Sequence, residues 1–249
     1  MTTSATPNLP AASTLAGRHL PGMTQPPTTP PLWEQQRARL DAYANAEVNY
    51  DFSRQNEYTS ATGWRIDDYE TDLPAEAPGP PAEAGTFAAA QDILRRYAFP
   101  PPDLITGIFS PDGPLEKRIM VLRAQFLFFK FYFGVRVSGV TDEAARAAPG
   151  GPERVWGYGY RTLEGHFERG QIDFTIHKNL GTGAVQFRIH AVSQPGQIRN
   201  PFYWVGFKLF GRRLQRKFAR ESLRRMRGMV AAALAQGTPA PPSVPVITG

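Results

Sequence analysis

Near its C-terminal end the sequence places an apolar residue at every third or fourth position over a long stretch, which predicts an amphipathic helix from Phe202 to Leu234. A helix of this kind has one apolar stripe that must be buried against another surface. The predicted stripe comprises Phe207, Phe210, Leu214, Phe218, Met226, Val230 and Leu234, with Ser222 in the remaining place.

The segments before this helix predict the surface that it covers. Apolar and polar residues alternate in Gln171–Lys178 and in Val185–Val192, and a glycine-rich turn, Asn179–Gly183, joins the two. Trp64–Leu73 and Arg154–Tyr160 predict further strands of one antiparallel sheet with a single buried face. Because such a face needs a cover, we expect an α+β fold, a helix-grip-like antiparallel β-sheet wrapped around a long C-terminal α-helix.

The most apolar block of the chain, Arg118–Val140, changes the phase of its alternation near Phe128–Lys130. The change predicts two strands, or one strand with a bulge. A helix over 115–128 stays an alternative, because some residues there have helical spacing: Leu115, Ile119, Leu122 and Phe126.

A shorter helix is predicted over Phe87–Tyr97, with Thr86 as its N-cap. Pro100–Pro102 ends it. The following segment, Asp103–Phe109, is expected to be a turn or a second helical element.

Composition divides the chain into three parts. Residues 1–46 are rich in Pro, Thr and Ala and are expected to be a mostly disordered arm, with a short helix over Trp33–Ala46. Residues 47–236 are expected to form a single domain, and residues 237–249 a flexible tail.

The chain has no cysteine, which excludes disulfides, thiolate metal sites and a cysteine nucleophile. No stretch has the length of a signal peptide's apolar region or of a membrane span. We therefore expect a soluble, cytoplasmic protein. The net charge of +6 favours an anionic partner or serves solubility alone.

Several motifs together resemble one bacterial and plant protein family. Trp156–Gly170 is similar to the family motif Y-G-T-L-x-G-H-x-E-x-G-E, and Phe187–Ser193 and Leu214–Arg220 match two further segments. Asn49–Tyr50 and Gly63–Tyr69 extend the resemblance over roughly Glu47–Val230. The family is DUF1990, a domain of unknown function.

The resemblance implies a helix-grip fold like that of the plant-allergen (Bet v 1) and START types, which bind hydrophobic ligands, and it implies no accepted activity. The family usually has Glu where this chain has Gln171, so a role for an acid at that position does not carry over.

The motif region also contains the candidate site. Thr162, Glu164, His166 and Glu168 suit a hydrogen-bonded turn, a ligand site, or an acid–base or metal site. The surplus aromatic residues before it suit a core or a cavity wall. The predicted ligand-binding residues are Tyr158, Tyr160, Thr162, Glu164, His166, Phe131, Phe133 and Phe207. We expect neither a metal nor a cofactor.

Two other polar features are left open. His177 and His190 are expected on solvated strand faces, paired with Asp173 or Arg188, or sharing a metal or cavity. The basic face of the long helix suits solvent, an anionic membrane or nucleic acid, and consists of Arg212, Arg213, Arg216, Lys217 and Arg220.

These observations support three hypotheses about function. The leading one is a protein that is not an enzyme and binds a small apolar or amphipathic ligand between sheet and helix. The second is an enzyme that uses the Glu164–His166–Glu168 region. The third is weak contact of the basic helix with an anionic membrane or nucleic acid.

Overall fold

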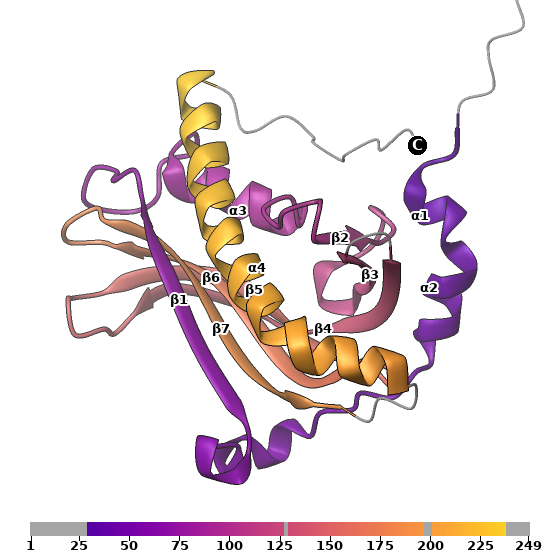
Figure 1. The fold of residues 1–249 in the computed structure, drawn as a ribbon. Helices are drawn as coiled ribbons and strands as arrows, with labels where there is room; N and C mark the ends of the chain where they lie inside the picture. The colour runs from indigo at the N-terminus through magenta and orange to yellow at the C-terminus, as the bar shows by residue number, and fades with distance from the viewer. Residues whose placement is uncertain (1–28, 127–128, 197–200, 238–249) are drawn as a thin grey trace, which may run out of the picture. The chain divides into compact units, whose positions relative to one another are not determined.

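One antiparallel sheet forms the centre of the structure, a computed structural model that describes residues 29–126, 129–196 and 201–237. Its strand order is β1-β7-β6-β5-β4-β3-β2 (Figure 1). The strands are β1 (Arg65–Leu73), β2 (Ile105–Ile108), β3 (Ile119–Phe126), β4 (Phe129–Arg146), β5 (Glu153–Thr162), β6 (Glu168–Asn179) and β7 (Val185–Pro195). The side chains of residues 126 and 201–211 are outside this description, as are the predicted arm before residue 29 and the tail after residue 237.

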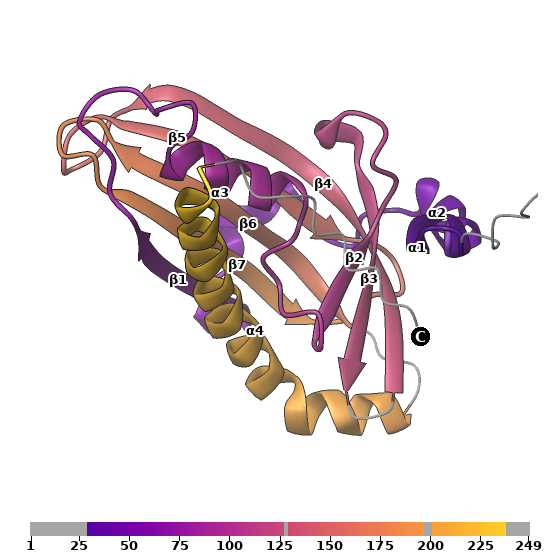
Figure 2. The ribbon, with the colours of Figure 1, turned by 90° about the horizontal axis from the view of Figure 1, so that it is seen from above.

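Two helices, α3 (Thr86–Arg95) and α4 (Pro201–Ala235), lie on the same, concave face of the sheet (Figures 1 and 2). The long helix predicted over Phe202–Leu234 is thereby confirmed. The sheet and α4 form the predicted helix-grip arrangement of an α+β fold. None of the described helices is both long and apolar enough to cross a lipid bilayer.

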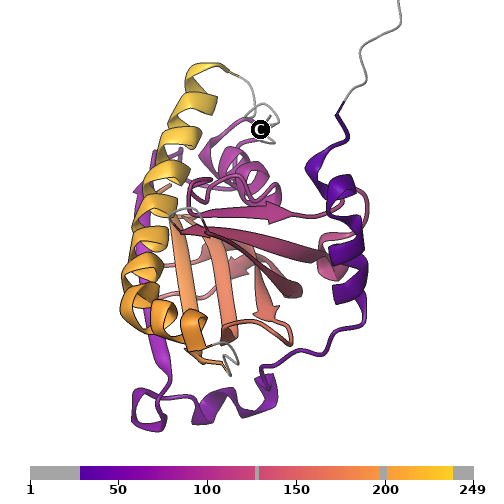
Figure 3. The ribbon, with the colours of Figure 1, turned by 45° about the vertical axis from the view of Figure 1, so that its right-hand side comes forward.

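Two short helices, α1 (Leu32–Gln35) and α2 (Arg37–Ala44), occupy the region predicted as one helix (Figure 3). The guanidinium of Arg39 lies 4.2 Å from the centre of the Tyr132 ring. A Cβ added to Gly134 would meet the Tyr43 ring at 2.3 Å, so α2 packs directly on the outer face of β4.

Aromatic and aliphatic side chains fill the space between sheet and helices. Phe99, which follows α3, lies 4.9 Å from the ring centre of Phe174 on β6 and 5.3 Å from that of Phe187 on β7. Met226 and Val230 of α4 complete this core and are fully buried. The predicted apolar stripe of α4 is therefore confirmed over its C-terminal part, including Ser222, which is also fully buried.

The most apolar block forms two strands, β3 and β4, so the helix considered over 115–128 is wrong. Within residues 115–126 only Leu115–Lys117 is helical, as a single 3₁₀ turn. Cross-strand pairing of the β-branched and aromatic side chains outweighs the helical spacing in this block.

Two smaller expectations are also corrected. Ile105–Ile108 is a strand paired with β3, where a turn or helix was predicted. Its alternating burial fits an edge strand. Thr86 is the first helical residue of α3 and Gly85 precedes it as N-cap.

The N-terminus of α3 is capped by a distant carboxylate. Glu76 Oε1 accepts a hydrogen bond of 2.7 Å from the Phe87 amide, and Oε2 accepts one of 2.6 Å from Lys178 Nζ. The side chains of Glu76 and Lys178 are 6% and 1% exposed. This buried ion pair connects the loop before α3 to the end of β6.

Replacing Glu76 with Ala is expected to lower the free energy of unfolding by about 3–5 kcal/mol, because it leaves the Lys178 ammonium buried without a counter-charge. Urea denaturation measures the loss. The exposed Glu116, replaced with Ala, is the matched control and should change stability by less than about 0.5 kcal/mol. Equal effects of the two substitutions would contradict the role given to Glu76.

Candidate functional site

Inward-facing side chains form rows across the sheet because cross-strand neighbours share a face. One such row runs from Asp67 on β1 through Ala191, Ile172 and Tyr160 to Val137 on β4. The next row toward the β5–β6 turn contains Arg65, Ser193 and Gly170.

The two ends of this concave face differ in burial. Toward α3 the inward side chains are buried: Leu73, Met120, Val137, Tyr158, Phe174, Ile176, Val185 and Phe187. Toward the β5–β6 turn a second set of inward side chains keeps part of its surface accessible, beside buried neighbours such as Val135 and Thr162. We call this second set the half-buried end: Arg65, Asp67, Tyr69, Phe131, Phe133, Glu168, Ile172, Ala191 and Ser193.

The β5–β6 turn borders the half-buried end. Thr162 Oγ1 accepts a hydrogen bond of 2.9 Å from the Gly170 amide and donates one to Asn49 Oδ1. A Cβ on Gly170 would meet the Val192 carbonyl oxygen at 2.2 Å, so only glycine fits at this close strand contact. Thr162 therefore holds the turn and is itself buried.

His166 connects this turn to the aromatic side chains of β4. Its Nδ1 accepts a hydrogen bond of 3.0 Å from the Glu168 amide, and its ring centre lies 4.8 Å from that of Phe133. Burial lowers the pKa of His166 to about 4, against a weaker opposing effect of the Glu168 hydrogen bond. The imidazole is therefore neutral at physiological pH.

Glu168 projects from the start of β6 toward α4. Its Oε1 accepts a hydrogen bond from Gln215 Nε2. Burial raises the pKa of Glu168 to about 7, although the charges of Arg65 and Arg212 and the Gln215 hydrogen bond lower it. A carboxyl group with this pKa exchanges its proton near neutral pH.

A bidentate ion pair ties α4 to β1 beside Glu168. Arg212 Nη1 lies 2.5 Å from Asp67 Oδ2, and Nη2 lies 2.6 Å from Oδ1. The hydrogen bonds from Arg212 lower the pKa of Asp67 and outweigh its partial burial. Arg212, predicted as part of the basic face, thus points to the sheet.

Three buried tyrosines contribute hydroxyl groups to the core beside the half-buried end. The hydroxyl groups of Tyr97 and Tyr160 lie 3.1 Å apart, and the hydroxyl of Tyr158 donates a 3.0 Å hydrogen bond to the Leu94 carbonyl. Burial raises the pKa of Tyr160 to about 12, and nearby Glu168 adds to this rise. Tyr97 has a φ of 53°, a left-handed conformation unusual for a residue with a side chain.

The structure distributes the predicted ligand-binding residues among different surroundings. Phe131 and Phe133 lie at the half-buried end near His166, whereas Tyr158 and Tyr160 are buried and Thr162 belongs to the turn. Of the other two predicted residues, Glu164 is exposed, and the side chain of Phe207 lies outside the described residues.

Three residues of this region were not predicted from the sequence: Asp67, Tyr97 and Gln215. Asp67 was detectable, because it is a charged residue at an inward position of an alternating strand. The contact of Gln215 could not be predicted, because a glutamine beside the apolar stripe of a helix is expected to face solvent. Nothing in the sequence pairs Tyr97 with Tyr160.

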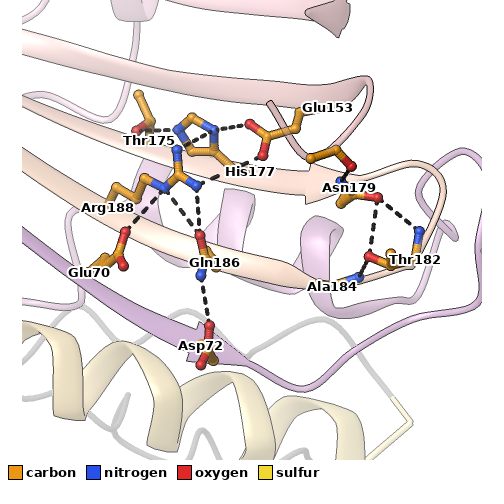
Figure 4. A network of polar contacts seen from close by, with 11 residues as sticks. Glu70, Asp72, Glu153, Thr175, His177, Asn179, Thr182, Ala184, Gln186 and Arg188 are labelled. Carbon is orange, nitrogen blue, oxygen red and sulfur yellow. Dashed lines mark hydrogen bonds and ion pairs between the residues drawn. The ribbon is translucent and has the colours of Figure 1, made fainter. Parts of the chain in front are cut away.

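A separate polar network lies on the outer face of the sheet (Figure 4). His177 Nδ1 lies 2.9 Å from Glu153 Oε2 and 3.3 Å from Arg188 Nη1. The expectation of a solvated His177 is wrong, since this residue is 5% exposed. Burial lowers the pKa of His177. His190 is exposed as predicted and pairs with Asp68 at 2.7 Å.

A hollow also lies on the protein surface beside the segment before β1. It is lined by Arg54, Glu57, Tyr58, Thr62, Trp64, Arg169 and Gln194. Its side chains already satisfy one another: Tyr58 stacks on Trp64 at 3.9 Å and Arg54 pairs with Glu57 at 2.6 Å. The described residues contain no cluster of three or more His, Asp or Glu side chains able to hold a metal ion.

The family model described as a domain of unknown function, DUF1990, matches residues 47–225. The chain therefore belongs to this family, as the motifs indicated. Comparison with curated proteins finds no match.

Several solved structures are similar to the chain. The Zhui aromatase/cyclase from Streptomyces sp. R1128 is 13% identical, with a TM-score of 0.47, and the match covers 70% of this chain and 99% of that one. Ara h 8.0201 is 11% identical, with a TM-score of 0.41 and coverage of 68% and 99%. A Thalictrum norcoclaurine synthase mutant in complex with a transition-state analogue is 10% identical, with a TM-score of 0.42 and coverage of 70% and 97%. Because these TM-scores are low, the fold assignment depends on the observed strand order and on the position of α4.

The raised pKa of Glu168 predicts a pH-dependent cost in stability. The native state holds the Glu168 proton more tightly than the unfolded chain, so its contribution to the free energy of unfolding falls as pH rises from 4.5 to about 7. Glu168→Gln is expected to be more stable than the wild type by about 1–3 kcal/mol above pH 7, with no difference below pH 4.5.

Urea denaturation at a series of pH values measures this difference. His166 titrates in an overlapping range, but it is present in both proteins and its effect cancels. The exposed Glu164, replaced with Gln, is the matched control and should change stability by less than about 0.5 kcal/mol at pH 8. A Glu168→Gln protein that is less stable than the wild type at pH 8 would contradict the account.

Proposed function

We propose that this protein binds a small apolar or amphipathic ligand at the half-buried end of the concave face, between the sheet and α4. The observation that supports the proposal most is the uneven burial of one continuous face. A structural core has no need for partly accessible Phe131, Phe133 and Ile172 beside fully buried Phe174 and Ile176. Such apolar surface with a few polar groups is typical of ligand sites.

Aromatic side chains supply the apolar surface of the proposed site. The rings of Phe131 and Phe133 are nearly parallel, at an interplanar angle of 6° and a centre distance of 6.4 Å. The Phe167 ring meets Phe133 edge-on at 4.7 Å. These rings offer their accessible surface to an aromatic or aliphatic body.

An enzyme that uses Glu164, His166 and Glu168 together is not favoured by the same geometry. The Glu164 side chain is exposed and forms no hydrogen bond or ion pair within the described residues. His166 Nδ1 is occupied by the Glu168 amide. The likeness to an aromatase/cyclase and to norcoclaurine synthase is one of fold.

Replacing Phe133 with Ala is expected to weaken binding of a neutral apolar fluorophore such as N-phenyl-1-naphthylamine roughly tenfold or more, because burial of a phenyl side chain contributes about 1.5–3 kcal/mol. Fluorescence titration gives the dissociation constants. Phe52, which is 41% exposed and lies against Arg161, is the matched control.

Phe52→Ala should bind as the wild type does. Native mass spectrometry of the purified protein is the independent measurement, and a co-purifying apolar ligand is expected. An empty protein that also binds no apolar probe would overturn the proposal.

A second candidate function is contact with an anionic surface through α4. Arg213, Arg216, Lys217 and Arg220 of α4 are exposed, although Arg216 acts on Asp67 of β1 and Lys217 Nζ lies 3.5 Å from Asp103 Oδ2. Because the described apolar stripe is packed against the core, insertion into a bilayer is not available to this part of the helix. Any contact would be electrostatic, at about 1 kcal/mol per basic residue at most.

Replacing Arg213, Arg216 and Arg220 with Gln is expected to weaken binding to phosphatidylserine vesicles up to roughly hundredfold at low salt. Vesicle sedimentation measures the partition. The matched control replaces three exposed basic residues elsewhere, Arg54, Lys117 and Lys130. Equal losses in both triple variants, or no binding by the wild type at low salt, would exclude this function.

A further inference from the structure

The tautomer of His166 is determined by its hydrogen bond. Since Nδ1 accepts from the Glu168 amide at 3.0 Å, the ring proton of the neutral imidazole is on Nε2. Within the part of the chain that the structure describes, Nε2 makes no hydrogen bond. His166 therefore offers one free donor beside the Phe133 ring, 4.8 Å away between centres.

Glu168, two residues further along the same turn, offers the complementary atom. Its Oε1 is taken by Gln215 Nε2, whereas Oε2 forms no hydrogen bond among the described residues. The side chain is half-buried, so one carboxyl oxygen is available as an acceptor. Donor and acceptor thus stand at the same margin of the proposed site.

The charged side chains around this pair balance one another. Asp67 and Arg212 neutralise each other in a bidentate ion pair. The charge of Arg65 opposes that of Glu168. Arg216, which also acts on Asp67, is exposed and screened by water. Among the described side chains, a charged group added to a ligand would therefore find no free counter-charge in this partly buried place.

The tyrosine hydroxyl groups beyond Glu168 do not compete for the same role. Tyr97 and Tyr160 bond each other at 3.1 Å, and Tyr158 donates to a backbone carbonyl at 3.0 Å. Tyr97, Tyr158 and Tyr160 are also only 5%, 1% and 6% exposed, so their hydroxyl groups lie beyond a ligand's reach. Among the polar side chains that stay partly accessible, His166 lies against the Phe133 ring and Glu168 follows it in the same turn.

We propose that His166 and Glu168 select an uncharged hydroxyl group on an aromatic ligand, an inference that rests on the proposed ligand-binding function. His166 Nε2–H donates to the hydroxyl oxygen, and the hydroxyl donates to Glu168 Oε2. A hydroxyl is the simplest neutral group that accepts and donates at once. The rings of Phe133 and Phe131 contact the aromatic body beside it.

The test uses four naphthalene probes that differ only in the head group: 2-naphthol, 2-methoxynaphthalene, 2-naphthoate and 2-naphthylmethylammonium. Isothermal titration calorimetry at pH 8 gives each dissociation constant. We expect 2-naphthol to bind roughly tenfold or more tightly than the methoxy probe, which cannot donate a hydrogen bond. Both charged probes should bind at least as weakly as the methoxy probe.

Three variants assign the preference to side chains. In Glu168→Leu, which removes the acceptor, the ratio between the methoxy and hydroxyl dissociation constants should fall below about threefold. In His166→Phe both probes should bind more weakly by a similar factor, because both oxygens accept from His166 Nε2, and the ratio should be kept. Glu164→Gln, an exposed carboxylate two residues before His166, should keep the full ratio.

The outcomes separate this inference from the function on which it rests. Four probes of equal affinity, or a charged probe that binds most tightly, would overturn the hydroxyl selectivity and leave ligand binding intact. No binding by any probe to the wild type would overturn both. A full preference retained in Glu168→Leu, or unchanged affinities of both probes in His166→Phe, would show that other residues recognise the hydroxyl.

Discussion

The structure depends on the burial of one apolar sheet face by α4 and α3. An antiparallel sheet of this size cannot leave a whole face of Phe, Ile and Val side chains in water, since each costs about 1.5–3 kcal/mol when exposed. α4 crosses that face and packs Met226 and Val230 against it. Phe99, which follows α3, belongs to the same core cluster. The packing is complete only toward α3. The other end of the same face carries half-buried aromatic rings and three charged residues, and this difference within one face is the basis of the proposed site.

The polar groups at the half-buried end carry a cost that the fold does not require. An apolar residue in place of Glu168 would avoid the penalty that raises its pKa to about 7. Burial likewise lowers the pKa of His166 to about 4, so its ring stays neutral at pH values well below the ordinary histidine pKa of 6.5. The Arg212–Asp67 pair, by contrast, contributes to the fold because it fixes α4 on β1. Groups that persist at a cost beside accessible aromatic rings are expected where a ligand is recognised.

Most of the fold was predictable because it follows local periodicity. Alternation identified most of β6 and β7, and the four-residue spacing through Phe218, Met226 and Val230 identified α4 and its buried side. Ile105–Ile108 was missed because a four-residue edge strand carries too few residues to show a period. The cap of α3 was misplaced because its acceptor, Glu76, lies ten residues before Thr86, beyond any local capping rule.

The candidate site was predictable only in part. The motif drew attention to His166, and aromatic surplus to Phe131 and Phe133. The strand order that brings β1 next to β7 places Asp67 and Arg65 near Glu168, and no local pattern contains that information. The chemistry of the site depends on the hydrogen-bond partner of each polar atom. The Glu168 amide determines the His166 tautomer, and Gln215 binds one oxygen of Glu168, whereas the other forms no hydrogen bond among the described residues.

The most direct test of the central claim is an NMR measurement of contacts between a bound naphthalene probe and protein labelled at the isoleucine and alanine methyl groups. The account predicts nuclear Overhauser effects from the probe to Ile172 and Ala191, and none to the fully buried Ile176. Effects to Ile176, or effects confined to methyl groups of the outer face, would show that the half-buried end is not the ligand site.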